Sequence, residues 1–399
     1  MLNLDNISKF IAFTIDLFND EFSSYIDYVD SFYYFSHGGC YELAKIIKHY
    51  FPDAQFVMKN DGKHCGVLYE GKIYDVFDGL SKEQLEKKGI HEDEYIKDIN
   101  DFKVLTKEEM EESMKIIKRA LELGINFFDT ADMYSLGESE RILGKAIKKY
   151  ANRDDVVIAT KIFYPLRDGK NNKGLSRKYI FEAVEASLKR LDMDYIDLLV
   201  IHRFDYDTPL EETMEALHDL IKMGKVRYIG ASAMYAWQFQ KANYIAEKHG
   251  WTKFISMQNH YNLLYREDER ELIPYCIDSG IQLTPYSPLA SGRLSRSSHE
   301  QSKRFEEDKV TQGKYINTLK EDNRIIDRVG EIADRKGITR VQVALAWLLS
   351  HNYVASPLIG ATKISHLEGA ISALDVKLTQ EEINYLEEEY IPHKIVGAI

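Results

Sequence analysis

From Thr106 to the end of the chain, apolar runs typical of buried strands alternate with amphipathic segments at an interval of roughly 30 residues. The runs are continuous, as expected for strands with both faces buried. The predicted strands are Ile125–Asp129, Val156–Lys161, Ile196–His202, Val226–Ser232, Phe254–Asn259, Ile281–Ser287 and Ala355–Gly360. Apolar positions at helical spacing predict helices over 138–150, 176–193, 209–225 and 339–352. This alternation predicts an α/β domain built on a parallel sheet.

Residues 1 to about 104 show a different pattern, rich in Tyr and Phe. Helices are predicted over Ile7–Tyr28 and Cys40–Phe51, and two β runs follow at 54–58 and 64–76. The second run contains Glu70-Gly71, which predicts a hairpin turn. A Lys- and Glu-rich segment then leads to Phe102–Leu105, where we place a domain boundary. We therefore expect a small α+β module over 1–104 and an α/β domain over 105–399.

Length, composition and charge favour a soluble protein of two domains and argue against several classes of partner. The 399 residues suit two unequal domains, and 44% apolar with 29% charged residues is ordinary for a soluble protein. No apolar run approaches the ~20 residues that span a bilayer, and the N-terminus is a poor signal peptide, so we expect a cytoplasmic protein without a membrane partner. A net charge of −12 argues against nucleic-acid binding. The three cysteines show neither a disulfide framework nor zinc-ligand spacing, so no metal is predicted.

Polar side chains stand at the carboxyl ends of the predicted strands. Asp129, Lys161 and His202 end three of them, and Tyr134 follows on the loop after Asp129. In a barrel of parallel strands these ends share one face and line one pocket. We expect Tyr134 to be the general acid toward a carbonyl oxygen, with the Lys161 ammonium stabilising its phenolate. Asp129 would hold Lys161 in place, and His202 would hydrogen-bond the carbonyl oxygen.

Each of these residues also has a structural interpretation on its own. Asp129 could cap the following loop, and a lone His202 is more often a hydrogen-bonded structural residue. Lys161 is harder to explain in this way, because an unpaired buried ammonium is costly. A phenol and a lysine cannot supply hydride, so the chemistry requires a nicotinamide cofactor. No G-x-G-x-x-G follows a strand, which argues against a Rossmann site.

Seven ordered segments between about Glu109 and the C-terminus resemble the aldo-keto reductases. They read NFFDTADMYSLGESERILGKAI, VVIATKIFYP, DLLVIHRFDYDTP, YIGASAMYAWQF, SMQNHYNLLYREDERELIPYC, PYSPLASGRL and PLIGATKISHLEGAI. The resemblance implies a (β/α)8 TIM barrel and reduction of aldehydes or ketones to alcohols. It also implies that Asp129, Tyr134, Lys161 and His202 form the family's catalytic tetrad.

The same resemblance implies a set of cofactor-binding residues. These are Ser232, Gln258, Tyr286, Ser287, Leu289, Gly292, Arg293, Gly360, Thr362 and Lys363. Ser232 and Gln258 match the residues that bind the carboxamide, and Ala233 replaces an Asn found in many members. Tyr286 matches the aromatic residue that stacks on the nicotinamide. Lys363 is suited to a 2′-phosphate, so NADPH is favoured over NADH.

The family's usual first barrel strand has no counterpart before Glu109. Seven strands are predicted where the barrel requires eight, which leaves the edges of Ile125–Asp129 and Ala355–Gly360 unpaired. Phe102–Leu105 is a candidate substitute, although it lacks the glycine loop that normally touches cofactor and substrate. We therefore hypothesise weak or absent reductase activity. A join between two unrelated reading frames is an alternative explanation for the missing strand.

The N-terminal module contains a possible second site. Cys40 is predicted at a helix start, where the helix dipole favours the thiolate, and His64 and Asp75 follow on the two β runs. This order resembles the core of papain-like and transglutaminase-like folds and small bacterial and phage modules. The structural alternative is a buried Cys40 and a surface His64. The alternative function for the chain is thus a cysteine hydrolase or binding module fused to an inactive barrel.

Three further expectations concern the barrel. His260 is interpreted as a structural or substrate-loop residue, and Cys276 as a packed core thiol. The pocket rim is predicted to be apolar and aromatic, which suits hydrophobic aldehydes or ketones. Its residues are Met133, Phe163, Tyr164, Arg203, Phe204 and Tyr235. The oligomeric state is not indicated by the sequence.

Overall fold

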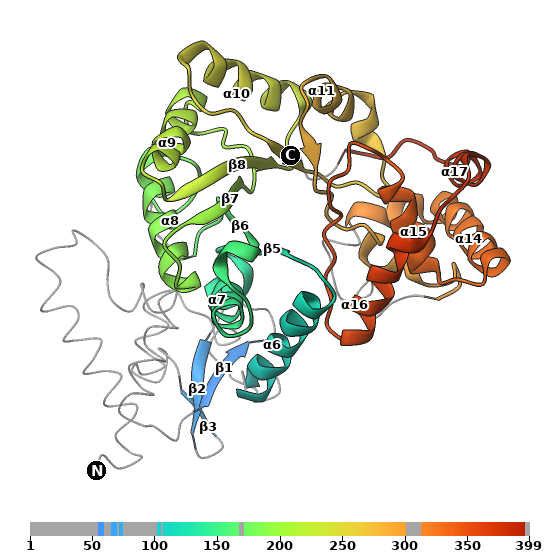
Figure 1. The fold of residues 1–399 in the computed structure, drawn as a ribbon, viewed down its shortest axis with the longest axis horizontal. Coiled ribbons are helices and arrows are strands. Elements are labelled where there is room, and N and C mark those ends of the chain that lie inside the picture. Colours follow the sequence, from blue (N-terminus) through green and yellow to red (C-terminus); the bar gives the residue numbers. More distant parts are fainter. Residues whose placement is uncertain are drawn as a thin grey trace, which may run out of the picture. The chain divides into compact units, whose positions relative to one another are not determined.

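The computed structural model describes residues 55–59, 65–69, 72–74, 102–104, 107–166, 171–300 and 313–395. The chain divides into two compact units, Met1–Ser113 with Pro165–Lys173, and Met114–Tyr164 with Gly174–Ile399. Figure 1 colours the described elements along the sequence. The helices expected over Ile7–Tyr28 and Cys40–Phe51 lie outside the described residues.

The first unit contains an antiparallel sheet with the order β3-β2-β1-β4. Its strands are β1 (Gln55–Lys59), β2 (Cys65–Tyr69), β3 (Lys72–Tyr74) and β4 (Phe102–Val104). Tyr69 pairs with Lys72, which confirms the predicted hairpin. Val104 pairs with Val57 of β1, so the stretch proposed as a substitute barrel strand belongs to this sheet instead. That proposal was wrong because a short alternating strand fits an antiparallel edge as well as a barrel.

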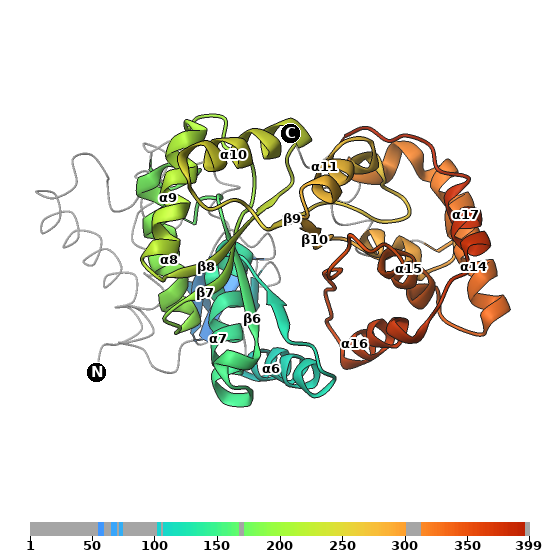
Figure 2. The same ribbon diagram turned by 45° about the horizontal axis from the view of Figure 1, so that its top comes forward.

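The second unit is a TIM-barrel-like fold around a curled parallel sheet with the order β10-β9-β8-β7-β6-β5. The strands are β5 (Phe127–Asp129), β6 (Val157–Ile162), β7 (Ile196–Ile201), β8 (Val226–Ser232), β9 (Ser256–Gln258) and β10 (Gln282–Leu283). The pairs Asp129 with Ala159 and Lys161 with Val200 set the register at the carboxyl ends. Figure 2 shows β6, β7 and β8 lying side by side.

The two edges of this sheet differ from the expected barrel. Among the described strands, β5 pairs only with β6. At the other edge the predicted strand over 355–360 is not a regular strand. Val354 forms an isolated parallel bridge with Leu283, and the Leu358 N–H donates to the Pro285 carbonyl at 2.8 Å. Pro285 and Pro357 each lack an N–H, which prevents a continuous ladder here. The described part of the barrel is therefore open beside β5.

Helices cover the outer side of the sheet, with α7 to α10 next to β6, β7 and β8 (Figure 1). The α-helices are α6 (Lys107–Glu122), α7 (Glu138–Tyr150), α8 (Arg177–Leu191), α9 (Leu210–Lys222), α10 (Ala236–His249), α11 (Leu272–Asp278), α14 (Leu319–Lys336), α15 (Arg340–Leu349), α16 (Ile364–Ile371) and α17 (Gln380–Glu387). The 3-10 turns are η5 (Tyr134–Gly137), η6 (Arg153–Asp155), η7 (Glu267–Arg270), η8 (Ala290–Ser295), η9 (Ile316–Thr318) and η10 (Ser372–Asp375). The four predicted helices are confirmed, and 138–150 matches α7 at both ends.

The core lies between this sheet and its helices. Ile158, Leu199 and Ile229 from the strands and Val184 and Leu217 from the helices are fully buried in one cluster. Their continuous apolar runs explain why the central strands were predictable. None of the helices in the described part of the chain has both the length and the apolar character needed to cross a membrane.

Candidate active site

The four predicted tetrad residues come together at the carboxyl ends of β5, β6 and β7. The Lys161 ammonium forms an ion pair with the Asp129 carboxylate and donates to the Thr130 carbonyl at 2.8 Å. It lies 3.4 Å from the Tyr134 hydroxyl. Lys161 is 1% exposed and Tyr134 is 40% exposed, so the ammonium is buried while the phenol opens outward. The Asp129 carboxylate therefore compensates for the burial of the ammonium beside the phenol.

His202 follows β7 and completes the group. Its ring centroid lies 5.9 Å from that of Tyr134 and 5.1 Å from that of Tyr164, both in edge-on orientation. Burial, together with the charges of Lys161 and Arg203, lowers the pKa of His202 to about 3. The ring is therefore neutral at pH 7 and can donate one hydrogen bond without carrying charge.

Two predicted cofactor residues connect the tetrad to the far side of the sheet. The Gln258 side-chain amide donates to the second Asp129 oxygen at 2.9 Å. This bond joins β9 to β5, which are not neighbours in the sheet, so it crosses the inside of the curl. The Ser232 hydroxyl donates to the Gln258 backbone carbonyl at 2.8 Å. Among the described residues, nothing donates to the Gln258 side-chain oxygen, which can therefore accept a hydrogen bond from a ligand amide.

Backbone strain gathers around the same residues. Six described non-glycine residues have a left-handed φ, and five of them lie in the catalytic loop or in the predicted cofactor segments. These five are Ser135, Ala233, Ser287, Ala290 and Ser291, with φ between 47° and 57°. The sixth, Asp192, is the C-cap of α8. Ala and Ser rarely adopt this strained conformation. Strained residues of this kind cluster at ligand sites.

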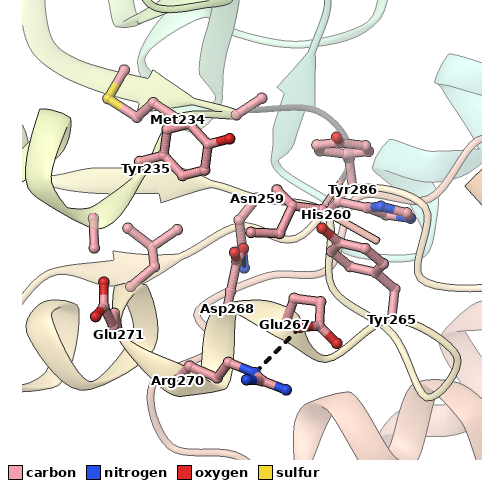
Figure 3. Close-up of a pocket in the computed structure, with 14 residues that line it drawn as sticks. Met234, Tyr235, Asn259, His260, Tyr265, Glu267, Asp268, Arg270, Glu271 and Tyr286 are labelled. Carbon is pink, nitrogen blue, oxygen red and sulfur yellow. Dashed lines mark hydrogen bonds and ion pairs between the residues drawn. The ribbon is translucent and has the colours of Figure 1, made fainter. Parts of the chain in front are cut away.

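A pocket of about 190 Å³ lies beside the predicted carboxamide segment, with Ala233, Asn259 and Tyr286 in its lining (Figure 3). Asn259 donates to the Asp268 carboxylate at 2.8 Å, and burial raises the pKa of Asp268 to about 6. Tyr286 stacks on His260 with ring centroids 5.2 Å apart, and burial raises the pKa of its phenol to about 12. The Lys314 ammonium lies 4.9 Å from the centroid of the Tyr286 ring.

His260 and Cys276 have packing roles. His260 is 3% exposed, hydrogen-bonds the Tyr315 hydroxyl at 2.8 Å and stacks on Tyr265 at 4.3 Å. The structural interpretation of His260 therefore fits its contacts. Cys276 is fully buried in α11, and burial raises the pKa of its thiol to about 12, in agreement with the expected core role.

The remaining predicted cofactor residues differ in their exposure and in whether the protein already pairs their charge. Gly360, Thr362 and Lys363 are all exposed, and Lys363 is the N-cap of α16. Leu289 and Gly292 flank the strained part of η8. Arg293 is 9% exposed at its side chain and forms an ion pair with buried Asp322. Its guanidinium is thus already neutralised by the protein, whereas Lys363 forms no ion pair with the described residues.

Comparison with known proteins identifies this arrangement. Residues 102–391 match the model of the aldo/keto reductase family. The chain belongs to this family. Versiconal hemiacetal acetate reductase of Aspergillus parasiticus is 48% identical over 305 residues, which cover 71% of this chain and 88% of that protein. A Schizosaccharomyces pombe protein named as an aryl-alcohol dehydrogenase is 44% identical over 316 residues, covering 73% of this chain and 89% of that protein.

A solved structure agrees with the reductase fold. The crystal structure of a thermostable aldo-keto reductase in complex with the inhibitor epalrestat is 29% identical, with a TM-score of 0.58. The match covers 71% of this chain and 89% of that one. Residues 16–120 are separately similar to a family described as phage YunG-like protein. Cys40, His64 and Asp75 lie outside the described residues, and the comparisons give no support for a papain-like module.

Sequence reasoning missed several residues of the reductase site. It did not single out Asp132, a buried acid inside the catalytic loop, or its buried neighbour Glu140. It also missed the bond from Gln258 to Asp129. The position of Asp132 between Asp129 and Tyr134 was the available signal, but its burial depends on residues distant in the sequence.

Proposed function

We propose that the protein reduces aldehydes or ketones to alcohols with NADPH. The observation that carries this proposal is the buried Lys161 ammonium, which contacts the Asp129 carboxylate and lies 3.4 Å from the Tyr134 hydroxyl. This arrangement suits a phenol that gives up a proton, because the ammonium stabilises the phenolate that remains. Membership of the aldo/keto reductase family supports the same chemistry.

Each tetrad residue has a role in the proposal. Tyr134 donates its proton to the carbonyl oxygen of the substrate as the carbon is reduced. Lys161 stabilises the resulting phenolate, and Asp129 keeps Lys161 charged and oriented. His202, which is neutral because burial lowers its pKa to about 3, donates a hydrogen bond to the same oxygen. A bound nicotinamide supplies the hydride.

The residues around the tetrad fit a nicotinamide cofactor. The Gln258 side-chain oxygen accepts no hydrogen bond from the described residues and can accept one from the carboxamide, and Ser232 lies beside it. The left-handed backbone at Ala233 and Ser287 flanks this position. Exposed Lys363 at the start of α16 is suited to the 2′-phosphate, since an ammonium and a helix N-terminus both attract anions. Arg293 would first have to leave Asp322 before it could reach a pyrophosphate.

Aromatic side chains support hydrophobic carbonyl compounds as substrates. Phe163 and Tyr164 pack edge-on at 5.2 Å, and Tyr164 continues this surface to His202. Phe204 packs edge-on against Tyr206 at 4.9 Å. Flat apolar compounds pack well against such rings. The relative named as an aryl-alcohol dehydrogenase is consistent with aromatic aldehydes as the first compounds to test.

Lys161→Met tests the proposal directly. We expect the variant to lose about 10²–10⁴-fold in kcat with an aromatic aldehyde, because the phenol loses its charged partner. NADPH affinity, measured by fluorescence quenching, should stay near that of the wild type. Lys222→Met, at an exposed position at the end of α9, is the matched control and should leave kcat unchanged. Equal kcat for Lys161→Met and the wild type would exclude the proposed mechanism.

The open edge of β5 favours a second candidate, a protein that binds NADPH but turns over weakly. Among the described strands β5 pairs only with β6, and β5 carries Asp129. An edge strand opens more readily than a central strand, so the Asp129–Lys161 pair would be less well held. The same assay separates the two candidates: NADPH quenching without measurable wild-type turnover would support the second.

A further inference from the structure

The loop after β5 continues along β6 as a strand-like segment. The Thr130 N–H donates to the Ala159 carbonyl at 2.9 Å, and the Asp132 N–H donates to the Lys161 carbonyl at 3.0 Å. In such extended backbone, alternate side chains point to opposite sides. Asp129 therefore faces the inside of the barrel with the tetrad. Thr130 and Asp132 face the layer between the sheet and the helices.

The layer beneath this loop is polar and almost completely paired. The Thr130 hydroxyl hydrogen-bonds the Ser139 hydroxyl at 2.8 Å. Glu140, which is fully buried on α7, accepts from the Thr160 hydroxyl at 2.6 Å and from the Arg190 guanidinium at 2.5 Å. These bonds satisfy the groups of α7, β6 and α8 that meet under the loop.

Asp132 is the exception in this layer. It is fully buried, and neither of its carboxyl oxygens has a hydrogen-bond partner among the described residues. Burial, together with the nearby Glu140 carboxylate, raises the pKa of Asp132 to about 8. The Arg190 guanidinium on α8, the backbone N–H of Met133 and the Lys161 ammonium on β6 act in the opposite direction. A buried acid without a partner is stable only when it is protonated.

The same layer supports the turn that carries Tyr134. The Tyr134 N–H donates to the Ala131 carbonyl at 3.2 Å, and the turn η5 ends at Gly137. Gly137 has a φ of 89°, and a Cβ there would collide with the Arg190 side chain. Arg190 thus lies directly against the turn while its head group is held by Glu140. A second carboxylate at Asp132 would compete with Glu140 for this guanidinium.

We propose that Asp132 is a positioning residue that keeps the Tyr134 turn in place only while its carboxyl group is protonated. On ionisation it releases one proton to solvent, is repelled by Glu140 and draws Arg190 away from its place against Gly137. The turn then loosens, and the Tyr134 hydroxyl leaves its position beside Lys161. The inference rests on the proposed function in one respect, namely that Tyr134 is the proton donor.

Asp132→Asn tests the inference through the pH dependence of kcat. The wild type should lose kcat about tenfold for each pH unit above pH 8, because one ionisation loosens the turn. The Asn variant cannot ionise, so it should keep its neutral-pH kcat to higher pH. Asp278→Asn, at an exposed position at the end of α11, is the matched control and should follow the wild type. An unchanged alkaline limb in Asp132→Asn would overturn the inference.

Hydrogen exchange gives a readout that does not depend on turnover. Residues 130–137 of the wild type should exchange several-fold faster at pH 9 than in Asp132→Asn, and equally at pH 6.5. Glu140→Gln is a second variant: without the neighbouring charge Asp132 ionises earlier, and faster exchange should begin at lower pH. If the wild type reduces no carbonyl compound, the proposed function fails while this experiment still decides the role of Asp132. Equal exchange at pH 9 would refute that role.

Discussion

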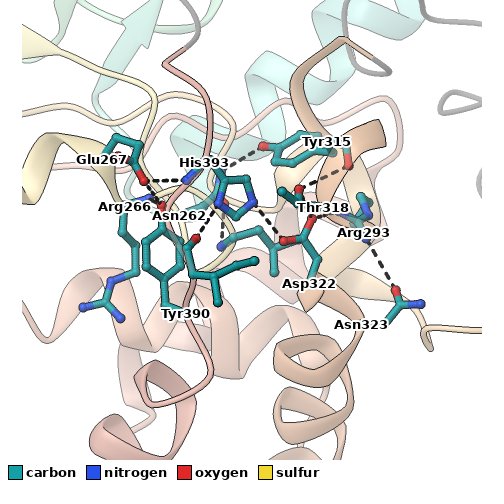
Figure 4. Close-up of polar contacts among 12 residues, drawn as sticks. Asn262, Arg266, Glu267, Arg293, Tyr315, Thr318, Asp322, Asn323, Tyr390 and His393 are labelled. Carbon is teal, nitrogen blue, oxygen red and sulfur yellow. Dashed lines mark hydrogen bonds and ion pairs between the residues drawn. The ribbon is translucent and has the colours of Figure 1, made fainter. Parts of the chain in front are cut away.

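Two buried aspartates of the parallel-sheet unit, Asp322 and Asp132, have opposite surroundings. Asp322 on α14 is 1% exposed, and both of its carboxyl oxygens have hydrogen-bond or ion-pair partners (Figure 4). One of its oxygens contacts the His393 ring nitrogen at 2.9 Å. The other contacts the Arg293 guanidinium and accepts from the Thr318 hydroxyl at 3.2 Å. Asp132 is equally buried and has no hydrogen-bond partner among the described residues.

The difference separates a structural acid from a functional one. Asp322 joins η8, α14 and the C-terminal segment, which are far apart in the sequence. Glu267 extends the network by accepting from the His393 N–H and the Tyr390 hydroxyl, both at 2.7 Å. Such a paired charge holds segments in one arrangement. The unpaired Asp132 costs stability beside the catalytic loop, and that cost is expected only where function requires it.

Removing the paired acid should have the largest effect. Asp322→Ala leaves the Arg293 guanidinium and the His393 ring buried without their partner. We expect a loss of about 3–5 kcal/mol in the free energy of unfolding, which is typical when one member of a buried pair is removed. Urea denaturation measures it. Asp327→Ala, on the exposed face of the same helix, should cost less than about 0.5 kcal/mol. Similar losses in the two variants would show that the network does not stabilise the fold.

The sequence predicted the centre of this fold better than its edges. The strands β6, β7 and β8 are long apolar runs and were predicted within one residue at each end. By contrast, β10 contains only two residues, and 355–360 joins the sheet through single bonds. Prolines interrupt both segments, and apolar pattern alone does not reveal where a ladder stops. The short β4 was assigned to the wrong sheet because its alternation fits either partner.

The candidate site shows the same division. The positions of Asp129, Lys161 and His202 at strand ends follow from the strand pattern itself. The unpaired state of Asp132 depends on how α7 and α8 pack over the loop. The partner of Asp322 is His393, which lies 71 positions later in the sequence. Partners of this kind are set by packing, which local periodicity does not encode.

Neutralising the unpaired acid should have an effect of opposite sign, which is smaller for each pH unit. An unfolded Asp has a pKa of about 3.9, whereas burial raises the pKa of Asp132 to about 8. Between these values the folded protein binds one proton more than the unfolded chain, so wild-type stability falls as pH rises from about 4 to about 8. Asp132→Asn lacks this loss. Its stability relative to the wild type should increase by up to about 1.4 kcal/mol for each pH unit between pH 6 and pH 8.

Urea denaturation of Asp132→Asn and the wild type at pH 5, 6, 7 and 8 measures this change. Asp278→Asn, at the exposed end of α11, should show no change with pH relative to the wild type. A constant difference between Asp132→Asn and the wild type across this range would show that Asp132 does not ionise with a raised pKa. The contrast between the two buried acids would then disappear.

We expect the smallest effect from replacing His393, the residue that contacts the Asp322 carboxylate. Burial lowers the pKa of His393, but the Asp322 carboxylate raises it, and the net direction is upward. The contribution of protonated His393 to the free energy of unfolding is therefore complete below about pH 6.5, and it is lost as pH rises through the raised pKa. We expect the wild type to exceed His393→Gln by about 1.5 kcal/mol at pH 6, and by less at pH 9. His249→Gln, on the exposed end of α10, is the control. The opposite result would be a difference in the free energy of unfolding between the wild type and His393→Gln that grows with pH. It would show that His393 is neutral in the folded protein, so that Arg293 would be the one cation paired with Asp322 among the described residues.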